Sequence, residues 1–400
     1  NPTVEWVNKY IAGPVGQVFL RMLFMVVMPL VFASITLGVA GLGDIRRVGR
    51  VGGKAIGYFF VTTCLAASLG LIVVNVMRPW DRVQPETRAA LMARFAGDAS
   101  TRVEAAATTA KFGPETFVNI VPRNPIDAAA KTDMLAVIFF GLMFGAALTM
   151  IASEKAKPMI VWLEALNEVV IQIIHFAMLL APYGVACLIF TVSSRFGFDL
   201  MIAVAAFVIT VLVALFAHVA ITLFAILRFV IGISPLVFLS RIKAALVTAF
   251  STSSSSATLP TGLEVSETQL GIPRQIAGFV LPIGSTMCMN GTAIFEGITV
   301  IFLAEIFNVD LTLVQMAIVM IMSVITAIGA AGVPGGSIPL LVGILTMFGV
   351  PGEGIAIVLG VDRILDMSRT TVNVFSDLTA TAFVARSEGI WSAKDVPALK

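Results

Sequence analysis

The segment Gly360–Asp377, GVDRILDMSRTTVNVFSD, places a dense set of charged and amide side chains inside an otherwise apolar part of the chain. On a helix that turns about 100° per residue, six of these polar side chains project from one stripe roughly 100° wide, and the rest of the circumference is largely apolar. The six are Asp362, Asp366, Arg369, Thr370, Asn373 and Asp377. We therefore expect one helix with a single charged face.

The charges on this helix need partners if it lies in a membrane. An Asp or Arg at the centre of a membrane helix costs about 2.5 to 3.5 kcal/mol, so such residues face protein, water or a ligand. One interpretation is internal pairing, of Asp362 with Arg363 or of Asp366 with Arg369, which would only fix how the helix packs. Alternating charge signs beside threonine and asparagine instead favour a binding site for a zwitterion.

The composition is that of a polytopic membrane protein. Hydrophobic residues make up 58% of the chain and charged residues 12%, with a mean hydropathy of +0.98, which is far from soluble proteins. A net charge of +2 indicates no nucleic-acid partner. The three cysteines show no CxxC spacing, so we expect neither a disulfide framework nor a cysteine metal site. We expect His175 and His218 to be core residues rather than ligands.

The first half of the chain reads as long apolar spans, and we expect a multi-pass protein of the inner (plasma) membrane. A span over Gln17–Leu42 leads into a turn rich in arginine and lysine at residues 44–54. By the positive-inside rule this turn is cytoplasmic, so residues 78–133 form an extracellular loop. Further spans are predicted over Leu135–Ile151, Val161–Val192 and Leu200–Ile231.

After residue 232 the apolar segments become short and interrupted, which indicates non-helical backbone held at membrane depth. The interruptions are STSSSSATLP at Ser251–Pro260, MCMNGT at Met287–Thr292 and GAAGVPGGSIP at Gly329–Pro339. A flexible serine linker and a simple helix-breaking turn are the alternatives for the first and third. A phosphate loop is excluded for the third, since no Lys-Ser/Thr follows.

We predict a two-fold inverted repeat from this order of segments. A helical hairpin at about 235–267 precedes a broken helix at 270–307, and a second hairpin at 311–345 precedes the polar helix at 351–388. Residues 1–77 are predicted scaffold, 134–231 are shared between scaffold and transport core, 232–388 are the core, and 389–400 are a cytoplasmic tail. Each hairpin would re-enter the membrane and bring its tip toward the bilayer midplane.

Taken together, these motifs resemble the glutamate transporter family, the dicarboxylate/amino acid:cation symporters. The resemblance runs from FLRMLFMVVMPLVFASI to NVFSDLTATAFVA and includes the serine-rich tip, the NGT break, the AGVPGG tip and the D-x-x-x-D-x-x-R-T-x-x-N-x-x-x-D helix in the family's order. The family has one more amino-terminal helix, which we expect to be missing here or to lie upstream of Asn1. The resemblance implies an all-α homotrimer that works as an elevator, and no enzymatic activity.

The resemblance also implies roles for individual residues. Asp366 would bind the substrate ammonium and Arg369 the side-chain carboxylate. The α-carboxylate would be held, and the site closed, by these residues: Asn373, Thr370, and the backbone of Ser254, Ser255, Ser256, Val333, Pro334, Gly335 and Gly336, with Thr292 lining the site.

The chemistry of the two charges agrees with a substrate that has one ammonium and two carboxylates. Arg369 offers a planar, permanently charged fork to a carboxylate, and Asp366 offers the opposite charge one turn away. A plain dicarboxylate would leave Asp366 unpaired, and a neutral amino acid would leave Arg369 unpaired at a cost of a few kcal/mol. We therefore rank L-aspartate and L-glutamate above C4-dicarboxylates.

The sodium motif departs from that of the sodium-coupled relatives, which read N-M-D-G-T where this chain has Cys288, Met289, Asn290, Gly291 and Thr292. Hard cations bind oxygen ligands, preferably charged ones, so one sodium site is expected to be absent. A second site, with Asp377, Asn373 and backbone near Gly284, keeps its side chains. A third, made largely of backbone, would use Thr286 and Met289. We expect no cofactor, and sodium is the one candidate metal ion.

Glu296 lies four residues after Thr292 and so on the same face of the helix. Some family members carry their coupled proton on a glutamate here, and pairing with Arg363 or Arg369 is the alternative role. With one sodium site altered, we favour proton-coupled or sodium-independent transport over multi-sodium symport. Arg363 would place a further positive charge near the site.

An anion channel and a membrane enzyme are the alternatives to a transporter. An anion channel would line its pore with the arginine stripe, but Asp366 and Asp377 would oppose anions there. A membrane enzyme lacks support, because the sequence shows no activated nucleophile and no HExxH motif.

Overall fold

The computed structural model describes residues 2–48, 50–84, 86, 121–131, 133–330, 332 and 334–396, and all regular structure within them is helical. In the first half these are α1 (Pro2–Val7), η1 (Asn8–Ala12), α2 (Gly13–Phe24), α3 (Val27–Val48), α4 (Arg50–Met77), η2 (Pro79–Arg82), α7 (Pro125–Ala130), α8 (Met134–Met150) and α9 (Ser153–Ala217). The second half holds η3 (His218–Leu223), η4 (Ile226–Ile231), α10 (Pro235–Thr252), α11 (Ser255–Thr268), α12 (Arg274–Met287), α13 (Asn290–Ile306), α14 (Leu313–Gly329), α15 (Ile338–Met347), η5 (Gly352–Ile355), α16 (Ala356–Ser387) and η6 (Ala393–Asp395). The η elements are short π or 3-10 helices.

Long apolar helices dominate the described part of the chain, where six segments are long and apolar enough to cross a membrane. They are Thr3–Leu37, Arg50–Arg82, Ser153–Ala177, Leu200–Ile231, Pro235–Thr252 and Arg274–Ile306. In the most apolar window of Arg274–Ile306, 94% of the residues are buried, against 17% in Ser153–Ala177. A helix that is apolar all round lies inside a bundle, so α13, whose residues are almost all buried, forms its centre, while the first part of α9 lies at its surface.

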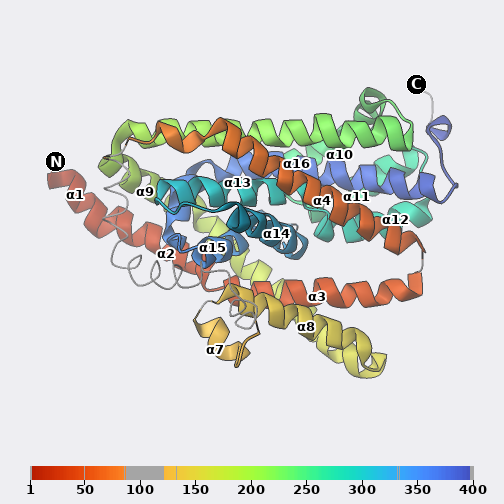
Figure 1. Cartoon of the computed structure of the whole chain (residues 1–400), viewed down its shortest axis with the longest axis horizontal. Coiled ribbons are helices and arrows are strands. Elements are labelled where there is room, and N and C mark those ends of the chain that lie inside the picture. Colours follow the sequence, from red (N-terminus) through yellow and green to blue (C-terminus); the bar gives the residue numbers. More distant parts are fainter. Residues whose placement is uncertain are drawn as a thin grey trace.

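The other helices pack around this centre in two groups. α3 lies along α8 and contacts α9, while α10, α11, α12 and α16 pack on one another, and Figure 1 shows the α3–α8 pair set apart from the rest. α4 packs along α13 and also contacts α12, α14 and α16. The predicted boundary at residue 77 assigns α4 to the scaffold, whereas its main partner in the structure is α13 of the predicted core. The boundary stays a prediction.

The three predicted interruptions lie at helix breaks. α10 and α11 are separated by Ser253 and Ser254, α12 and α13 by Cys288 and Met289, and α14 and α15 by the segment from residue 330 to 337, in which Ala331 and Val333 lie outside the described residues. The charged stretch forms α16 as one uninterrupted helix.

Two predicted spans differ from the observed helices. The span over Gln17–Leu42 is divided between α2 and α3 at Met25, whose carbonyl cannot be bonded four residues later because Pro29 has no N–H. Residues 153–217 form one continuous helix, α9, although the predicted span Leu200–Ile231 is found with the same bounds among the segments long and apolar enough to cross a membrane. Figure 1 shows that this helix changes direction, and Pro158 and Pro182 inside it are the usual cause of such bends. Most of the predicted loop at 78–133 lies outside the described residues.

Candidate functional site

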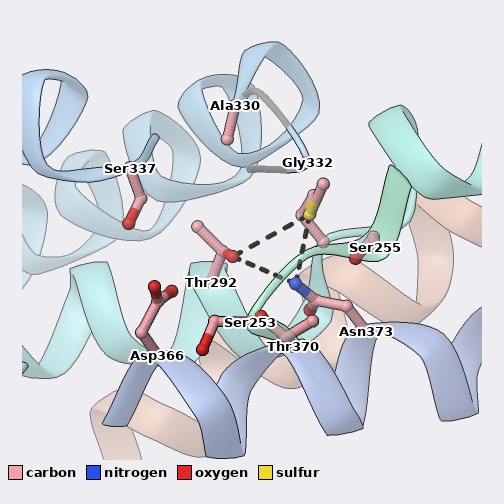
Figure 2. A pocket seen from close by; sticks show the side chains of 10 residues that line it. Ser253, Ser255, Thr292, Ala330, Gly332, Ser337, Asp366, Thr370 and Asn373 are labelled. Carbon is pink, nitrogen blue, oxygen red and sulfur yellow. Dashed lines mark hydrogen bonds between the residues drawn. The ribbon is translucent and has the colours of Figure 1, made fainter. Parts of the chain in front are cut away.

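The helix breaks converge on α16 and enclose a polar cavity (Figure 2). Its lining comes from the α10–α11 tip, the α12–α13 break, the α14–α15 segment and α16. The lining residues are Ser253, Ser255, Met289, Thr292, Ala330, Gly332, Ser337, Asp366, Thr370 and Asn373. The cavity measures about 20 Å³, which is room for about one water molecule. A ligand of several non-hydrogen atoms is therefore larger than this cavity.

The α10–α11 tip is held closed against the α14–α15 segment. Ser253 ends α10 with a φ of 53°, a left-handed conformation, and Ser254 caps α11 by accepting a hydrogen bond from Ala257 N. The Ser254 hydroxyl donates to the Gly332 carbonyl at 2.6 Å. The Ser256 amide donates to the same carbonyl at 3.2 Å. These two bonds join the tips of segments that are about 80 residues apart.

Asn373 of α16 bonds the free backbone at the start of α13. Its Oδ1 accepts from the Gly291 amide at 2.7 Å, and its Nδ2 donates to Thr292 Oγ1 at 3.2 Å and lies 3.1 Å from Met289 Sδ. The first amides of a helix have no partner within the helix. A side chain of α16 therefore bonds a backbone amide that the break leaves without a partner, and Figure 2 shows the contact of the same side chain with Thr292 beside the cavity.

Arg369 lies at the centre of the charged stripe and is only 1% exposed. Its Nη2 donates to Asp366 Oδ1 at 2.8 Å and to Asp362 Oδ1 at 3.1 Å, and its guanidinium carbon lies 3.8 Å from the centre of the Phe295 ring. Among the described residues, Nε and Nη1 have no hydrogen-bond partner. Asp366 Oδ2 accepts from the Gly335 amide at 3.2 Å and lines the cavity.

The internal pairing of Asp366 with Arg369, expected as the alternative to a binding site, is present. Asp362 pairs with Arg369 and not with Arg363 as expected, because a spacing of seven residues returns to the same side of a helix. Arg363 is exposed and forms no hydrogen bond or ion pair with a described residue. Of the three paired charges, Asp366 lines the cavity, whereas Asp362 and Arg369, the predicted carboxylate ligand, do not.

Asp377 is the strongest candidate among the predicted sodium ligands. It is 3% exposed, its Oδ1 has no partner among the described residues, and a Cβ added to Gly284 would meet that oxygen at 2.7 Å. Thr286 is exposed and donates to the Ile283 carbonyl, and the Met289 carbonyl accepts from the Ala293 amide at 2.9 Å. The donor set therefore fits a cation beside Asp377 and Gly284 better than one at Thr286 and Met289.

Glu296 is fully buried on α13, one turn beyond Thr292, and does not line the cavity. Its Oε2 accepts from Thr326 Oγ1 at 2.6 Å, and its Oε1 has no partner among the described residues. The expected alternative, an ion pair with Arg363 or Arg369, is not formed in the described part of the chain. A buried carboxyl with one free oxygen is suited to carry a proton.

The sequence located part of the cavity lining. Thr292, Ser255, Asp366, Thr370 and Asn373 line it as expected. Val333 lies outside the described residues, while Gly336 is buried and Pro334 half-buried near the tip. The lining residues that the sequence reasoning missed are Ser253, Met289, Ala330, Gly332 and Ser337. Ser253 and Ser337 lie directly next to predicted site positions, and this adjacency is the feature of the sequence by which they could have been found.

A second buried polar network lies on the other side of the α12–α13 break. Asn290 Oδ1 accepts from Thr63 Oγ1 at 2.8 Å, and Asn290 Nδ2 lies 3.0 Å from Ser376 Oγ and 3.1 Å from His218 Nε2. His218 was expected to be a satisfied core residue, but its Nδ1 has no partner among the described residues.

Comparisons with known proteins agree with this geometry. A model of the sodium:dicarboxylate symporter family matches residues 3–387. The chain is 34% identical over 376 residues to the proton/sodium-glutamate symport protein of Geobacillus stearothermophilus, with 94% of this chain and 87% of that protein covered. It is 32% identical over 385 residues to the proton/glutamate-aspartate symporter of Escherichia coli (strain K12), with 96% and 87% covered. It is also 34% identical over 389 residues to a C4-dicarboxylate transport protein of Bacillus subtilis (strain 168), with 97% and 90% covered.

Proposed function

The chain belongs to the sodium:dicarboxylate symporter family, and from that premise we propose that it is a secondary-active transporter that imports L-aspartate or L-glutamate across the plasma membrane. The observation that carries the proposal is the buried Arg369–Asp366 pair beside a polar cavity. Relatives named as glutamate symporters support the substrate class.

The substrate would enter by exchanging partners with this pair. Its ammonium would take the place of Arg369 at the Asp366 carboxylate, and its side-chain carboxylate would pair with the guanidinium nitrogens of Arg369 that have no partner now. Each buried charge then gains an opposite charge as it loses one, so neither is left uncompensated. Thr370, Asn373 and the backbone of the two tips would hold the α-carboxylate.

The tips would act as gates. Their closed state rests on the two bonds to the Gly332 carbonyl, which are few enough to break and reform in each transport cycle. We further propose re-entrant hairpins, an elevator movement of α10–α16, and a homotrimer, all three following from family resemblance. α4 packs along α13, so it would move with the core.

A cation would be a co-substrate of this cycle. Glu296 is the proposed proton carrier, and Asp377 with Gly284 is the proposed sodium position. We favour proton coupling because Cys288 and Asn290 stand at positions where the sodium-coupled relatives have more oxygen ligands, while Glu296 is fully buried with one free oxygen.

The deciding experiment is uptake of labelled L-aspartate into proteoliposomes. We expect an inward proton gradient to drive uptake without sodium, and Glu296→Gln to abolish the response to that gradient. Glu264→Gln changes an exposed glutamate of α11 and should leave uptake as it is. Uptake that requires sodium and ignores the proton gradient would instead support a sodium-coupled acidic amino acid symporter.

A C4-dicarboxylate is the second candidate substrate, because relatives named as C4-dicarboxylate transport proteins match at 34% and 32% identity. In the structure Asp366 already accepts from Arg369 and from the Gly335 amide, so its charge is partly compensated without an ammonium. Competition decides between the two. Succinate that displaces labelled aspartate at equal concentration would shift the substrate assignment to dicarboxylates.

A further inference from the structure

We propose that His218 is a second proton-binding group of this carrier, linked to the substrate site through Asn290. The link to the substrate site rests on the transport function proposed above. Its first test, however, is independent of substrate. The imidazole is fully buried at the start of η3, and it meets Asn290 at the break between α12 and α13.

The hydrogen bonds define the proton position in the conformation shown. Asn290 Oδ1 accepts from Thr63, so the group that Asn290 presents to His218 is its amide Nδ2, a donor. His218 Nε2 must then accept, and the imidazole is neutral with its proton on Nδ1. That Nδ1 has no partner among the described residues, so the neutral form leaves one polar group unsatisfied.

The same network can hold the charged form after one rotation. When a proton binds to Nε2 of His218, this nitrogen becomes a donor. If the amide of Asn290 then rotates by about 180°, its Oδ1 can accept the hydrogen bond from Nε2. Nδ2 then faces Thr63 Oγ1, whose one proton turns to the Phe59 carbonyl 2.7 Å away, so that the oxygen accepts from Nδ2. Ser376 Oγ, which donates to the Val372 carbonyl now, can turn to Oδ1. Both protonation states therefore satisfy Asn290.

Among the described residues, the charged groups on the elements around His218 have partners of their own or are exposed, apart from Asp377. The elements packed against η3 are α4, α9, α16 and η4. Asp377 follows Ser376 in α16 and lies beside Cys288 and Tyr58. Arg386 of the same helix is exposed, as are Glu154, Lys155, Lys157, Glu164 and Glu168 of α9. The other charged groups have different partners or face outward: Arg50 and Lys54 pair with Glu388, Asp362 and Asp366 pair with Arg369, Glu296 bonds Thr326, and Arg228 and Arg363 are exposed.

The link to the substrate site runs through one residue. Gly291 follows Asn290, and its amide donates to Asn373 Oδ1 beside the cavity. A rotation of Asn290 acts on the first turn of α13, and Thr292 of that turn lines the cavity. Because linkage is reciprocal, a substrate that favours one state of Asn290 also changes the proton affinity of His218.

The first test uses the chain's two histidines. In the His175→Gln variant, ¹⁵N-histidine labelling leaves His218 as the one labelled imidazole of this chain, studied in lipid nanodiscs. We expect nitrogen NMR to show the neutral form with its proton on Nδ1 at pH 7, and a charged ring as the pH falls to about 4.5. A proton on Nε2 at pH 7, or a ring that stays neutral throughout, would overturn the proposal.

Asn290→Asp in the same background is the matched variant. A carboxylate in place of the amide should hold the imidazole charged at pH 7, since it can only accept a hydrogen bond from it. A ring that remains neutral at pH 7 in this variant would show that residue 290 does not control the proton.

The second test measures linkage by titrating L-aspartate binding against pH in Glu296→Gln, which removes the other proposed proton carrier. We expect affinity to rise as pH falls, by at most about tenfold per pH unit, the limit for one linked proton. His218→Gln added to Glu296→Gln should make affinity independent of pH, and persistence of the slope contradicts the link. If neither protein binds aspartate, the proposed substrate fails while the NMR titration still decides the role of His218.

Discussion

Arg369 is a buried side chain that holds two carboxylates in the folded protein and is also the proposed ligand of the substrate carboxylate. Its guanidinium is stacked on Phe295 and held by Asp362 and Asp366, yet two of its nitrogens have no partner among the described residues. A planar fork can make all these contacts at once, whereas an ammonium is a point charge. The chemistry of the site therefore depends on arginine at this position and not merely on a positive charge.

Arg369→Lys tests this dependence. The lysine keeps the charge that compensates Asp362 and Asp366, so the protein should fold, but it loses the second set of donors for substrate. We expect the affinity for L-aspartate, measured by calorimetry, to fall about ten- to a hundredfold, the worth of one hydrogen bond to a charged group. Arg363→Lys, at the exposed arginine of the same helix, is the control. Equal affinities for both variants would refute the site assignment.

At the scale of helices, the contact between α13 and α16 brings the site together. A Cβ added to Gly291 would lie 2.5 Å from the Arg369 carbonyl oxygen, a backbone atom that cannot rotate away. Only glycine allows this approach. The close contact places Asn373 within reach of the Gly291 amide, so the packing of two helices also sets the geometry of the cavity.

Gly291→Ala should therefore destabilise the protein by about 1 to 3 kcal/mol, the usual cost of overpacking, and weaken substrate binding with it. The matched control is Gly278→Ala in α12, where an added Cβ meets nothing within 4 Å; there, a helical alanine should be neutral or slightly stabilising. Thermal unfolding in detergent compares the two. A Gly291→Ala protein as stable as the Gly278→Ala protein would show that the helices can separate without penalty.

At the scale of the whole molecule, the carboxyl end of α16 is tied back to the start of α4. Glu388 accepts from Arg50 Nη2 at 2.7 Å and from Lys54 Nζ at 2.6 Å, and Lys54 also donates to the Ser387 carbonyl. Trp391, just beyond, donates to the Leu270 carbonyl between α11 and α12. The chain end thereby connects helices that are more than 300 residues apart in sequence.

Hydrogen bonds from Arg50 and Lys54 lower the pKa of Glu388 to about 2 from its ordinary value of 4.5. The folded pKa lies below the unfolded one, so this contact stabilises the protein fully above about pH 4.5 and loses its effect as the pH falls toward 2. We expect the Glu388→Gln variant to melt at a lower temperature than the wild type at pH 7. Below pH 4 the two melting temperatures should lie closer together. Asp310→Asn, at an exposed aspartate, is the control. A constant difference at every pH would argue against the ion pairs.

The sequence by itself determined the features that depend on local order along the chain. The charged face of α16 follows from helical spacing, and the serine-rich, NGT and glycine-rich segments lie at the observed breaks because glycine, proline and serine cannot continue an apolar helix without cost. Asp366, Thr370 and Asn373 could be identified because they share one stripe with Arg369. Which apolar segments would remain one helix, as α9 does, could not be read from composition alone.

Only the tertiary structure decided which distant groups meet. Asp362 turns to Arg369 and not to its neighbour Arg363, and His218 meets Asn290 across 72 residues of sequence. The sequence alone shows only that the polar residues of Gly360–Asp377 share one face of a helix. In the folded chain this face becomes a site, because Gly291 lets α13 approach and the two tips close over Asp366. Such contacts depend on packing between helices, which periodicity within a single helix does not encode.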